Sequence, residues 1–226
     1  ESTARRLADL GAHVVVNSST SVEAGKNVAA SLATKGAYVQ ADISDQAQGK
    51  KLIDETIDIF GRLDILVNNA GWTTLVPHGD LDGLTDEIFD KTFKVNVYGT
   101  WWLTKSAVPH LKQSDDGNVV NITSIAGVRP VGSSMAYAMT KAALNHMTVL
   151  MAKSYGPIRF NAVAPGLVQT PWTQDWGVMH DFVSKASPLK RSAYASDCSE
   201  AVLGIVRNPH MTGQVLVIDG GFTLVS

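Results

Sequence analysis

A tyrosine and a lysine four residues apart, Tyr137 and Lys141, are the two side chains of this sequence best suited to acid–base chemistry. On a helix, residues at this spacing share one face. A phenol with a pKa near ~10 is a poor acid or base at neutral pH, but a neighbouring ammonium stabilises the phenolate and lowers that pKa. Proton transfer works best when the pKa lies near the working pH, so the pair suits carbonyl–alcohol interconversion. Taken alone, a tyrosine and a lysine at this spacing usually lie on the surface without a function. The surrounding sequence therefore decides the interpretation.

Alternating strands and helices would position this pair. Short apolar runs predict strands at residues 13–17, 38–42, 64–68, 118–123, 158–163 and 215–218. Helical spacing and composition predict helices at residues 24–35, 48–60, 86–111 and 135–155. Helices between continuous apolar strands predict an α/β fold: one domain over residues 1–226, with a doubly wound parallel sheet covered by helices on both faces.

Polar and small residues follow five of the predicted strands. In parallel sheets, ligands bind beyond the carboxyl ends of the strands. The residues at that edge are Asn17-Ser18-Ser19, Asp42, Asn68-Asn69-Ala70-Gly71, Ser124 and Pro165-Gly166. Each segment could be an ordinary strand-ending turn, but five of them at one edge favour a binding site.

With these residues in place, the sequence resembles the short-chain dehydrogenase/reductase family. The family pattern has a serine thirteen residues before the tyrosine, here Ser124, and Asn-Asn-Ala-Gly after a central strand. It has an asparagine in the preceding long helix, here Asn96, and Arg-x-Asn-x-x-x-Pro-Gly after the catalytic helix, here starting at Arg159. The resemblance extends to residues 212–221 and covers nearly the whole chain in family order. It implies a Rossmann-like fold and an NAD(P)-dependent oxidoreductase.

The resemblance also implies roles for single residues. Tyr137 would exchange a proton with the substrate oxygen, Ser124 would hydrogen-bond that oxygen, and Lys141 would bind the nicotinamide ribose and lower the pKa of Tyr137. Asn96 would help to hold a water that connects Lys141 to solvent. The further cofactor contacts would be Asp42, Asn69, Ala70, Gly71, Pro165, Gly166, Val168 and Thr170.

Structural interpretations stand beside these roles. Ser124 and Asp42 could cap turns, Asn96 could satisfy backbone groups in a bent helix, and Asn68 and Asn69 could be purely structural.

Cofactor preference depends on residues 17–20, Asn-Ser-Ser-Thr. NAD-selective members of the family tend to carry an acidic residue there, which pairs with the ribose 2′-hydroxyl and repels a 2′-phosphate. The side chains of Asn17, Ser18 and Ser19 are neutral and could accept a phosphate. We therefore expect NADP(H) to be favoured modestly over NAD(H).

The start of the chain departs from the family pattern. Residues 1–10 correspond to the family's first helix, so the opening strand and the Thr-Gly-x-x-x-Gly-x-Gly turn are not in this sequence. That turn normally receives the pyrophosphate, and the strand is central to the sheet. Two hypotheses follow: an active dehydrogenase/reductase, favoured by the intact Ser124, Tyr137 and Lys141, and a catalytically silent relative that binds a dinucleotide or a partner protein.

Net charge, cysteine content and histidine spacing bear on the partners, the compartment and metal binding. The formal charge of -2, from 19 basic and 21 acidic residues, gives no reason to expect nucleic acid or an anionic membrane as a partner. The single cysteine, Cys198, permits a reducing cytoplasm. The six histidines show no ligand spacing, so no metal is expected.

The expectations for substrate and assembly are broader. Trp72, Trp172 and Trp176 would either line a pocket for an apolar or ring-bearing substrate or pack a lid against the body, and residues 131–135 should line the same pocket. Family members are usually homodimers or homotetramers, and the apolar stretch at residues 135–155 would fit such an interface or the core.

Overall fold

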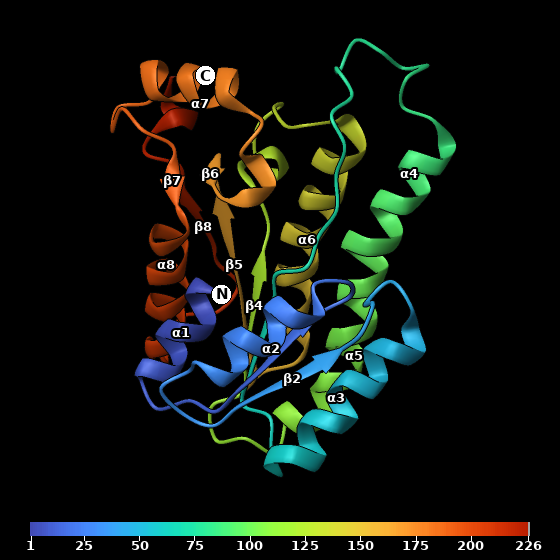
Figure 1. The fold of residues 1–226 in the computed structure, drawn as a ribbon, viewed down its shortest axis with the longest axis vertical. Helices are drawn as coiled ribbons and strands as arrows, with labels where there is room; N and C mark the ends of the chain where they lie inside the picture. Colours follow the sequence, from blue (N-terminus) through green and yellow to red (C-terminus); the bar gives the residue numbers. More distant parts are fainter. Residues whose placement is uncertain (226) are drawn as a thin grey trace.

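The strands of the described part of the chain all pair in parallel. The computed structural model describes residues 1–225 of the chain. Its strands are β1 (Val14–Ser18), β2 (Gly36–Gln40), β3 (Ile65–Asn68), β4 (Asn118–Ile122), β5 (Arg159–Pro165), β6 (Val168–Gln169), β7 (Ala193–Tyr194) and β8 (Val215–Ile218). The predicted parallel sheet between helices is confirmed, and the fold is Rossmann-like (Figure 1).

Helices join these strands. They are α1 (Ser2–Asp9), α2 (Val22–Ala30), α3 (Gln46–Phe60), α4 (Asp86–Phe93), α5 (Thr100–Leu111), α6 (Met135–Ser154), α7 (Gly177–Ala186) and α8 (Ala195–Arg207). A π-helical segment, η1 (Lys94–Gly99), joins α4 to α5, and short 3-10 turns lie at η2 (Ile125–Gly127), η3 (Pro171–Thr173) and η4 (Phe222–Leu224). Among the residues described, no helix is both long enough and apolar enough to cross a bilayer.

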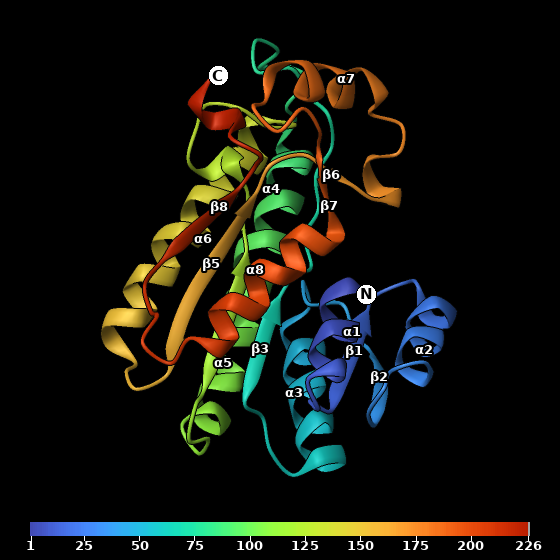
Figure 2. The same cartoon turned by 90° about the vertical axis from the view of Figure 1, so that its left-hand side faces the viewer.

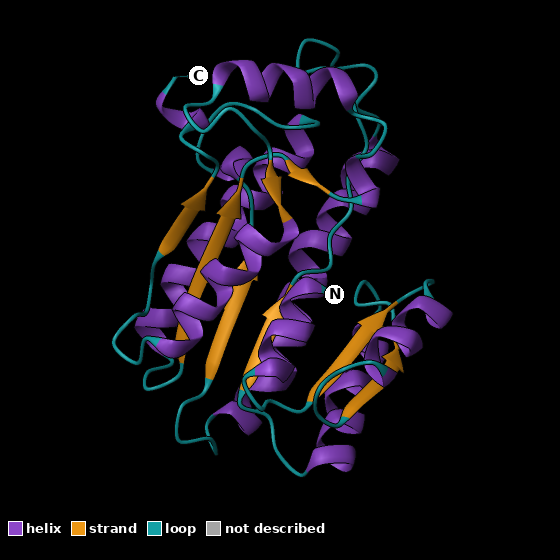
Figure 3. Ribbon diagram, turned by 60° about the vertical axis from the view of Figure 1, so that its left-hand side comes forward, coloured by secondary structure: helices purple, strands orange, loops and turns teal. Residues whose placement is uncertain are grey.

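The main sheet is in two parts. Strands β3, β4, β5 and β8 are hydrogen-bonded in that order, whereas β1 pairs only with β2. Figures 2 and 3 show the β1–β2 pair beside the β3 edge of the larger sheet. This break, between β1 and β3, lies where a central strand was expected to be lacking.

Two layers of helices bury the two faces of the larger sheet. Neighbouring residues of a strand point to opposite faces, and Val119 and Val120 of β4 are both fully buried because each face is covered. Val119 belongs to the cluster with side chains of α3, α5 and α6, and Val120 belongs to the cluster with side chains of α8. Helix α1 packs against α8.

Some element boundaries differ from the prediction. The helix expected at 86–111 contains the π-helical segment at 94–99. The helix expected at 24–35 ends at Ala30, and the strand expected at 38–42 spans Gly36–Gln40. The carbonyl of Ala12 accepts a hydrogen bond from the Thr34 hydroxyl, which fixes the turn between α2 and β2. Strands β6 and β7 and helix α7 were not predicted, since they are short and lack a clear period.

Candidate active site

Helix α6 carries the tyrosine–lysine pair and lies against β5. The helix begins after Ser134, whose fully buried side chain accepts a hydrogen bond from the backbone N–H of Tyr137 at 3.2 Å. Such a cap satisfies one of the free N–H groups of the first turn. Tyr137 therefore lies in the first turn of α6, and Lys141 follows one turn later.

Ser124 meets Tyr137 from the end of β4. Its hydroxyl accepts a hydrogen bond from the backbone N–H of Ala126 at 3.1 Å, so it also caps the turn η2. Burial raises the pKa of Tyr137 to about 12, and the nearby Ser124 side chain opposes this rise with a smaller effect. The phenol is therefore protonated at neutral pH.

Lys141 is buried beside the same tyrosine. Its Nζ lies 5.5 Å from the centre of the Tyr137 ring and donates a hydrogen bond to the carbonyl of Ile122 at 3.0 Å. Burial lowers the pKa of Lys141 to about 8. The pKa of Tyr137 is raised overall, because burial of the phenol is the largest effect. The predicted lowering of this pKa by Lys141 stays a prediction.

Asn96 joins the loop after β3 to α6. Its fully buried side chain accepts a hydrogen bond from the N–H of Trp72 at 2.7 Å and donates to the Trp72 carbonyl and the Thr140 hydroxyl, both at 3.0 Å. A Cβ added to Gly71 would lie 3.4 Å from Asn96 Oδ1 and 3.7 Å from Lys141 Nζ. Gly71, Asn96 and Lys141 therefore lie together. The backbone-satisfying role of Asn96 is observed, and its role in holding a water stays a prediction.

A buried polar network lies under this group. The Asn68 amide donates to Thr104 Oγ1 at 3.0 Å and to Asn121 Oδ1 at 2.8 Å, and the Asn121 amide donates to Thr148 Oγ1 at 2.9 Å. The network connects β3 and β4 to α5 and α6, so the structural interpretation of Asn68 holds. Sequence reasoning missed Thr104, Asn121 and Thr148, although polar residues inside apolar elements usually have buried partners.

The end of β1, residues Asn17, Ser18 and Ser19, is held by β2. The Asn17 amide donates one hydrogen bond to the Val39 carbonyl and one to the Ala41 carbonyl, both at 3.0 Å. An amide has two N–H donors, so the expectation that Asn17 offers a free donor to a phosphate is wrong.

Asp42 lies just beyond the end of β2. Its Oδ1 accepts the Ser44 N–H at 2.9 Å, as in a turn. Its predicted contact with adenine stays a prediction.

The segment after β5 contains the last predicted cofactor contacts. A Cβ on Gly166 would lie 3.0 Å from the Asp219 Cβ, so glycine permits this close approach. Val168 begins β6, and the Thr170 N–H donates to Thr173 Oγ1 at 3.3 Å. The structure thus places Pro165, Gly166, Val168 and Thr170 on one segment beyond β5, and their contacts with a cofactor stay predictions.

The tryptophans have separate environments. The Trp72 ring lies 4.3 Å from the ammonium of Lys91, a cation–π contact with α4. Trp172 is 54% exposed. Trp176 is half-buried at the start of α7.

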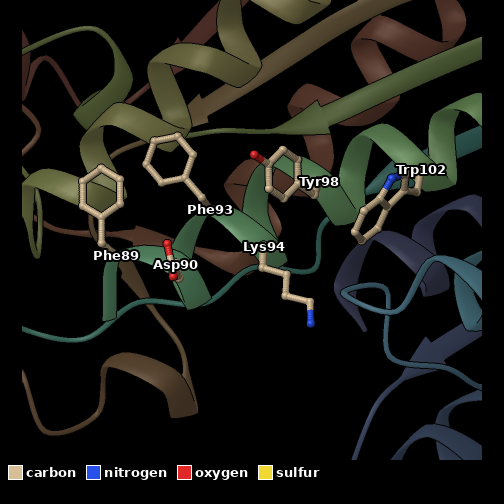
Figure 4. Close-up of a pocket in the computed structure, with 6 residues that line it drawn as sticks. All are labelled: Phe89, Asp90, Phe93, Lys94, Tyr98 and Trp102. Atoms are coloured by element: carbon tan, nitrogen blue, oxygen red, sulfur yellow. The ribbon is translucent and has the colours of Figure 1, made fainter. Parts of the chain in front are cut away.

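A hollow of about 540 Å³ opens elsewhere, on α4, η1 and α5 (Figure 4). It is lined by Phe89, Asp90, Phe93, Lys94, Tyr98 and Trp102. None of Ser124, Tyr137 and Lys141 lines it. The convergence of those three residues, rather than this hollow, therefore marks the candidate active site.

Comparisons with known proteins agree over the length of the chain. The family model described as enoyl-(acyl carrier protein) reductase matches residues 1–223. A Streptomyces violaceoruber protein, provisionally named ketoacyl reductase 2 of the granaticin polyketide synthase, is 47% identical over 229 residues, covering 100% of this chain and 92% of the relative. A 3-alpha-(or 20-beta)-hydroxysteroid dehydrogenase of Mycobacterium tuberculosis is 34% identical over 203 residues, covering 88% of this chain and 75% of the relative.

A solved structure is similar over the same length. The gluconate 5-dehydrogenase from Burkholderia cenocepacia J2315, in complex with NADP and tartrate, has a TM-score of 0.89 at 26% identity. The match covers 100% of this chain and 91% of that one. The structural comparison and the sequence comparison therefore both match this chain to dehydrogenases and reductases.

Proposed function

Because this chain belongs to the short-chain dehydrogenase/reductase family, we propose that it interconverts a carbonyl and a secondary alcohol by hydride transfer with a nicotinamide dinucleotide. Tyr137 is the proton-transfer residue. The whole chain, residues 1–226, acts as one catalytic and dinucleotide-binding domain. The observation that carries the proposal is the convergence of Ser124, Tyr137 and Lys141, with a phenol that is protonated at neutral pH.

The three side chains divide the work. A bound nicotinamide dinucleotide supplies or accepts the hydride. During reduction, Tyr137 donates its proton to the carbonyl oxygen, and Ser124 donates a hydrogen bond that holds this oxygen in place. The phenol is protonated at neutral pH, which is the state that proton donation to a carbonyl oxygen requires.

The residues fit a dinucleotide. The hydrogen bond to the Ile122 carbonyl uses one of the three N–H donors of the Lys141 ammonium, which leaves donors for the hydroxyls of a ribose. Gly71 approaches Lys141 without a side chain, and Asn96 supports the loop that follows.

We favour NADP(H) over NAD(H), since residues 17–20 carry no carboxylate and a similar dehydrogenase is described with NADP. The remaining cofactor contacts are those named from the family resemblance.

Substrate and assembly follow from the same comparisons and from exposed side chains. The relatives act, by name, on ketoacyl groups and hydroxysteroids, so β-ketoacyl thioesters and ketosteroids are the first substrates to test. Large apolar side chains on α5 and α6 are exposed, Trp101 by 40% and Leu150 by 51%. They support a homodimer or homotetramer, which light scattering of the purified protein can measure. The reducing cytoplasm is the compartment that we propose.

Tyr137→Phe tests the function. We expect the variant to keep its thermal unfolding midpoint and to lose carbonyl reduction with NADPH and NADH by at least about a hundred-fold, the usual contribution of one acid–base group. Tyr155→Phe is the matched control, because Tyr155 packs on Phe160 at the far end of α6.

Undiminished turnover by Tyr137→Phe would refute the assignment. Dinucleotide binding by the wild-type protein without turnover on the whole carbonyl panel would instead favour a catalytically silent sensor.

A further inference from the structure

Tyr38 reaches from β2 to the end of β1. The register pairs Tyr38 with Val16, which lies two residues before Ser18 on the same face of the strand. Two residues of a strand span about 6.6 Å, a distance that a phenol side chain covers. The Tyr38 hydroxyl lies 2.8 Å from Ser18 Oγ and 3.2 Å from the Ser18 carbonyl oxygen, and its one hydrogen can be donated to either atom. One phenol thus holds both the side chain and the backbone of Ser18.

Helix α2 fixes the ring of this tyrosine. A Cβ added to Gly25 would lie 2.2 Å from Cε2 of Tyr38, which is far closer than van der Waals contact. Glycine therefore leaves the space that the ring occupies between α2 and the strands. The phenol has little freedom to turn away from Ser18.

Neighbouring side chains hold the rest of the end of β1. The Asn17 amide is bound to β2 as described above, and the Gln40 amide donates to the Ser19 carbonyl at 2.8 Å. The half-buried Ser18 hydroxyl is consequently a fixed group at the ligand-binding edge, whereas the Asn17 amide is already committed.

The two hydroxyls differ as donors. A phenol is more acidic than an aliphatic alcohol and is the stronger hydrogen-bond donor. The phenol has one hydrogen, which either the Ser18 carbonyl or Ser18 Oγ accepts. When an outside acceptor takes the hydrogen of the Ser18 hydroxyl, the Tyr38 hydrogen is directed at Ser18 Oγ, and the two hydroxyls form a chain of two hydrogen bonds. A phosphate only accepts hydrogen bonds, and bonds to a charged acceptor are about twice as strong as neutral ones. Glu23 is the acidic residue nearest to Ser18 along the chain, and its carboxylate forms an ion pair with Lys26 at 3.0 Å.

We propose that Tyr38 is a specificity-determining positioning residue, which orients the Ser18 hydroxyl toward the 2′-phosphate of the cofactor and so favours NADPH over NADH. The inference rests on the proposed function, because it requires a dinucleotide at this edge of the sheet. Tyr38 itself acts through Ser18 and does not contact the reacting atoms.

Tyr38→Phe is the decisive variant, since it keeps the ring against Gly25 and removes only the hydroxyl. We would measure the dissociation constants of NADPH and NADH for the wild-type protein, Tyr38→Phe, Ser18→Ala and the double variant, with Tyr155→Phe as the control for a lost phenol. We expect Ser18→Ala to weaken NADPH binding by about ten-fold, the effect of one hydrogen bond to a charged group. We expect a similar loss in Tyr38→Phe, because the Ser18 hydroxyl then lacks the partner that orients it toward the phosphate. NADH binding should change by less than about two-fold, and the double variant should be no weaker than either single one.

Turnover gives a second measurement that a merely structural role would not reproduce. In Tyr38→Phe, the KM for NADPH should rise while kcat stays within about two-fold of the wild type. Equal losses for both cofactors, additive losses in the double variant, or an unchanged NADPH preference would overturn the inference while leaving the proposed function intact. A wild-type protein that binds neither cofactor would overturn both.

Discussion

Lys141→Met should make the protein more stable and inactive. At pH 7 the native state holds this buried side chain mostly as an ammonium, although burial lowers its pKa from 10.5 to about 8. Each pKa unit corresponds to about 1.36 kcal/mol, so the charged form costs the native state about 3 kcal/mol relative to the unfolded chain. The hydrogen bond to the Ile122 carbonyl, worth about 1.5 kcal/mol, is lost in the variant. The net stabilisation by methionine at pH 7 is therefore about 1–2 kcal/mol.

The difference in unfolding free energy between Lys141→Met and the wild type changes with pH, and the lowered pKa of Lys141 sets the sign of this change. Between pH 8 and pH 10.5 the unfolded chain keeps the Lys141 proton that the native state has released. The free energy of unfolding of the wild-type protein therefore rises with pH in this window and falls as the pH drops through 8. At pH 9.5 the wild type should have gained about 2 kcal/mol relative to Lys141→Met. The raised pKa of Tyr137 acts in the opposite direction only above pH 10, and it is present in both proteins.

Urea unfolding followed by tryptophan fluorescence, at pH 7 and at pH 9.5, measures this difference. Lys153→Met is the control, since Lys153 lies on the same helix and is exposed. If the difference in unfolding free energy between Lys141→Met and the wild type is the same at both pH values, within about 0.5 kcal/mol, the argument from burial fails.

Two further predictions concern packing around the site. Gly127→Ala should destabilise the protein by about 2 kcal/mol and lower kcat, because its Cβ would lie 2.5 Å from the carbonyl carbon of Lys141; Gly204→Ala in α8, which meets no atom within 4 Å, should stabilise by about 0.5–1 kcal/mol. Similar urea midpoints for the two variants would contradict this. Arg159→Met should lower the unfolding free energy by about 2–3 kcal/mol, since buried Arg159 donates to carbonyls at the end of α8 that the variant leaves unpaired, whereas its ion-pair partner Asp116 is exposed; a loss below about 1 kcal/mol in the same assay would refute it.

The sequence alone predicted most of the scaffold. Continuous apolar runs marked β3, β4, β5 and β8, and their order with the helices predicted a parallel sheet, because these periodicities are local properties of the chain. Helical spacing predicted that Tyr137 and Lys141 share one face, and the family resemblance implied that Ser124 joins them.

Only the tertiary structure decided how these groups behave. Whether the pKa of Tyr137 falls or rises depends on how much water the fold removes, and burial, which spacing does not report, raises it. Whether Ser18 or Asn17 is available to a ligand depends on contacts with β2, twenty residues away along the chain. Periodicity reflects only the neighbours of a residue within one helix or strand. Solvation and side-chain partners depend on elements that meet only in the folded chain.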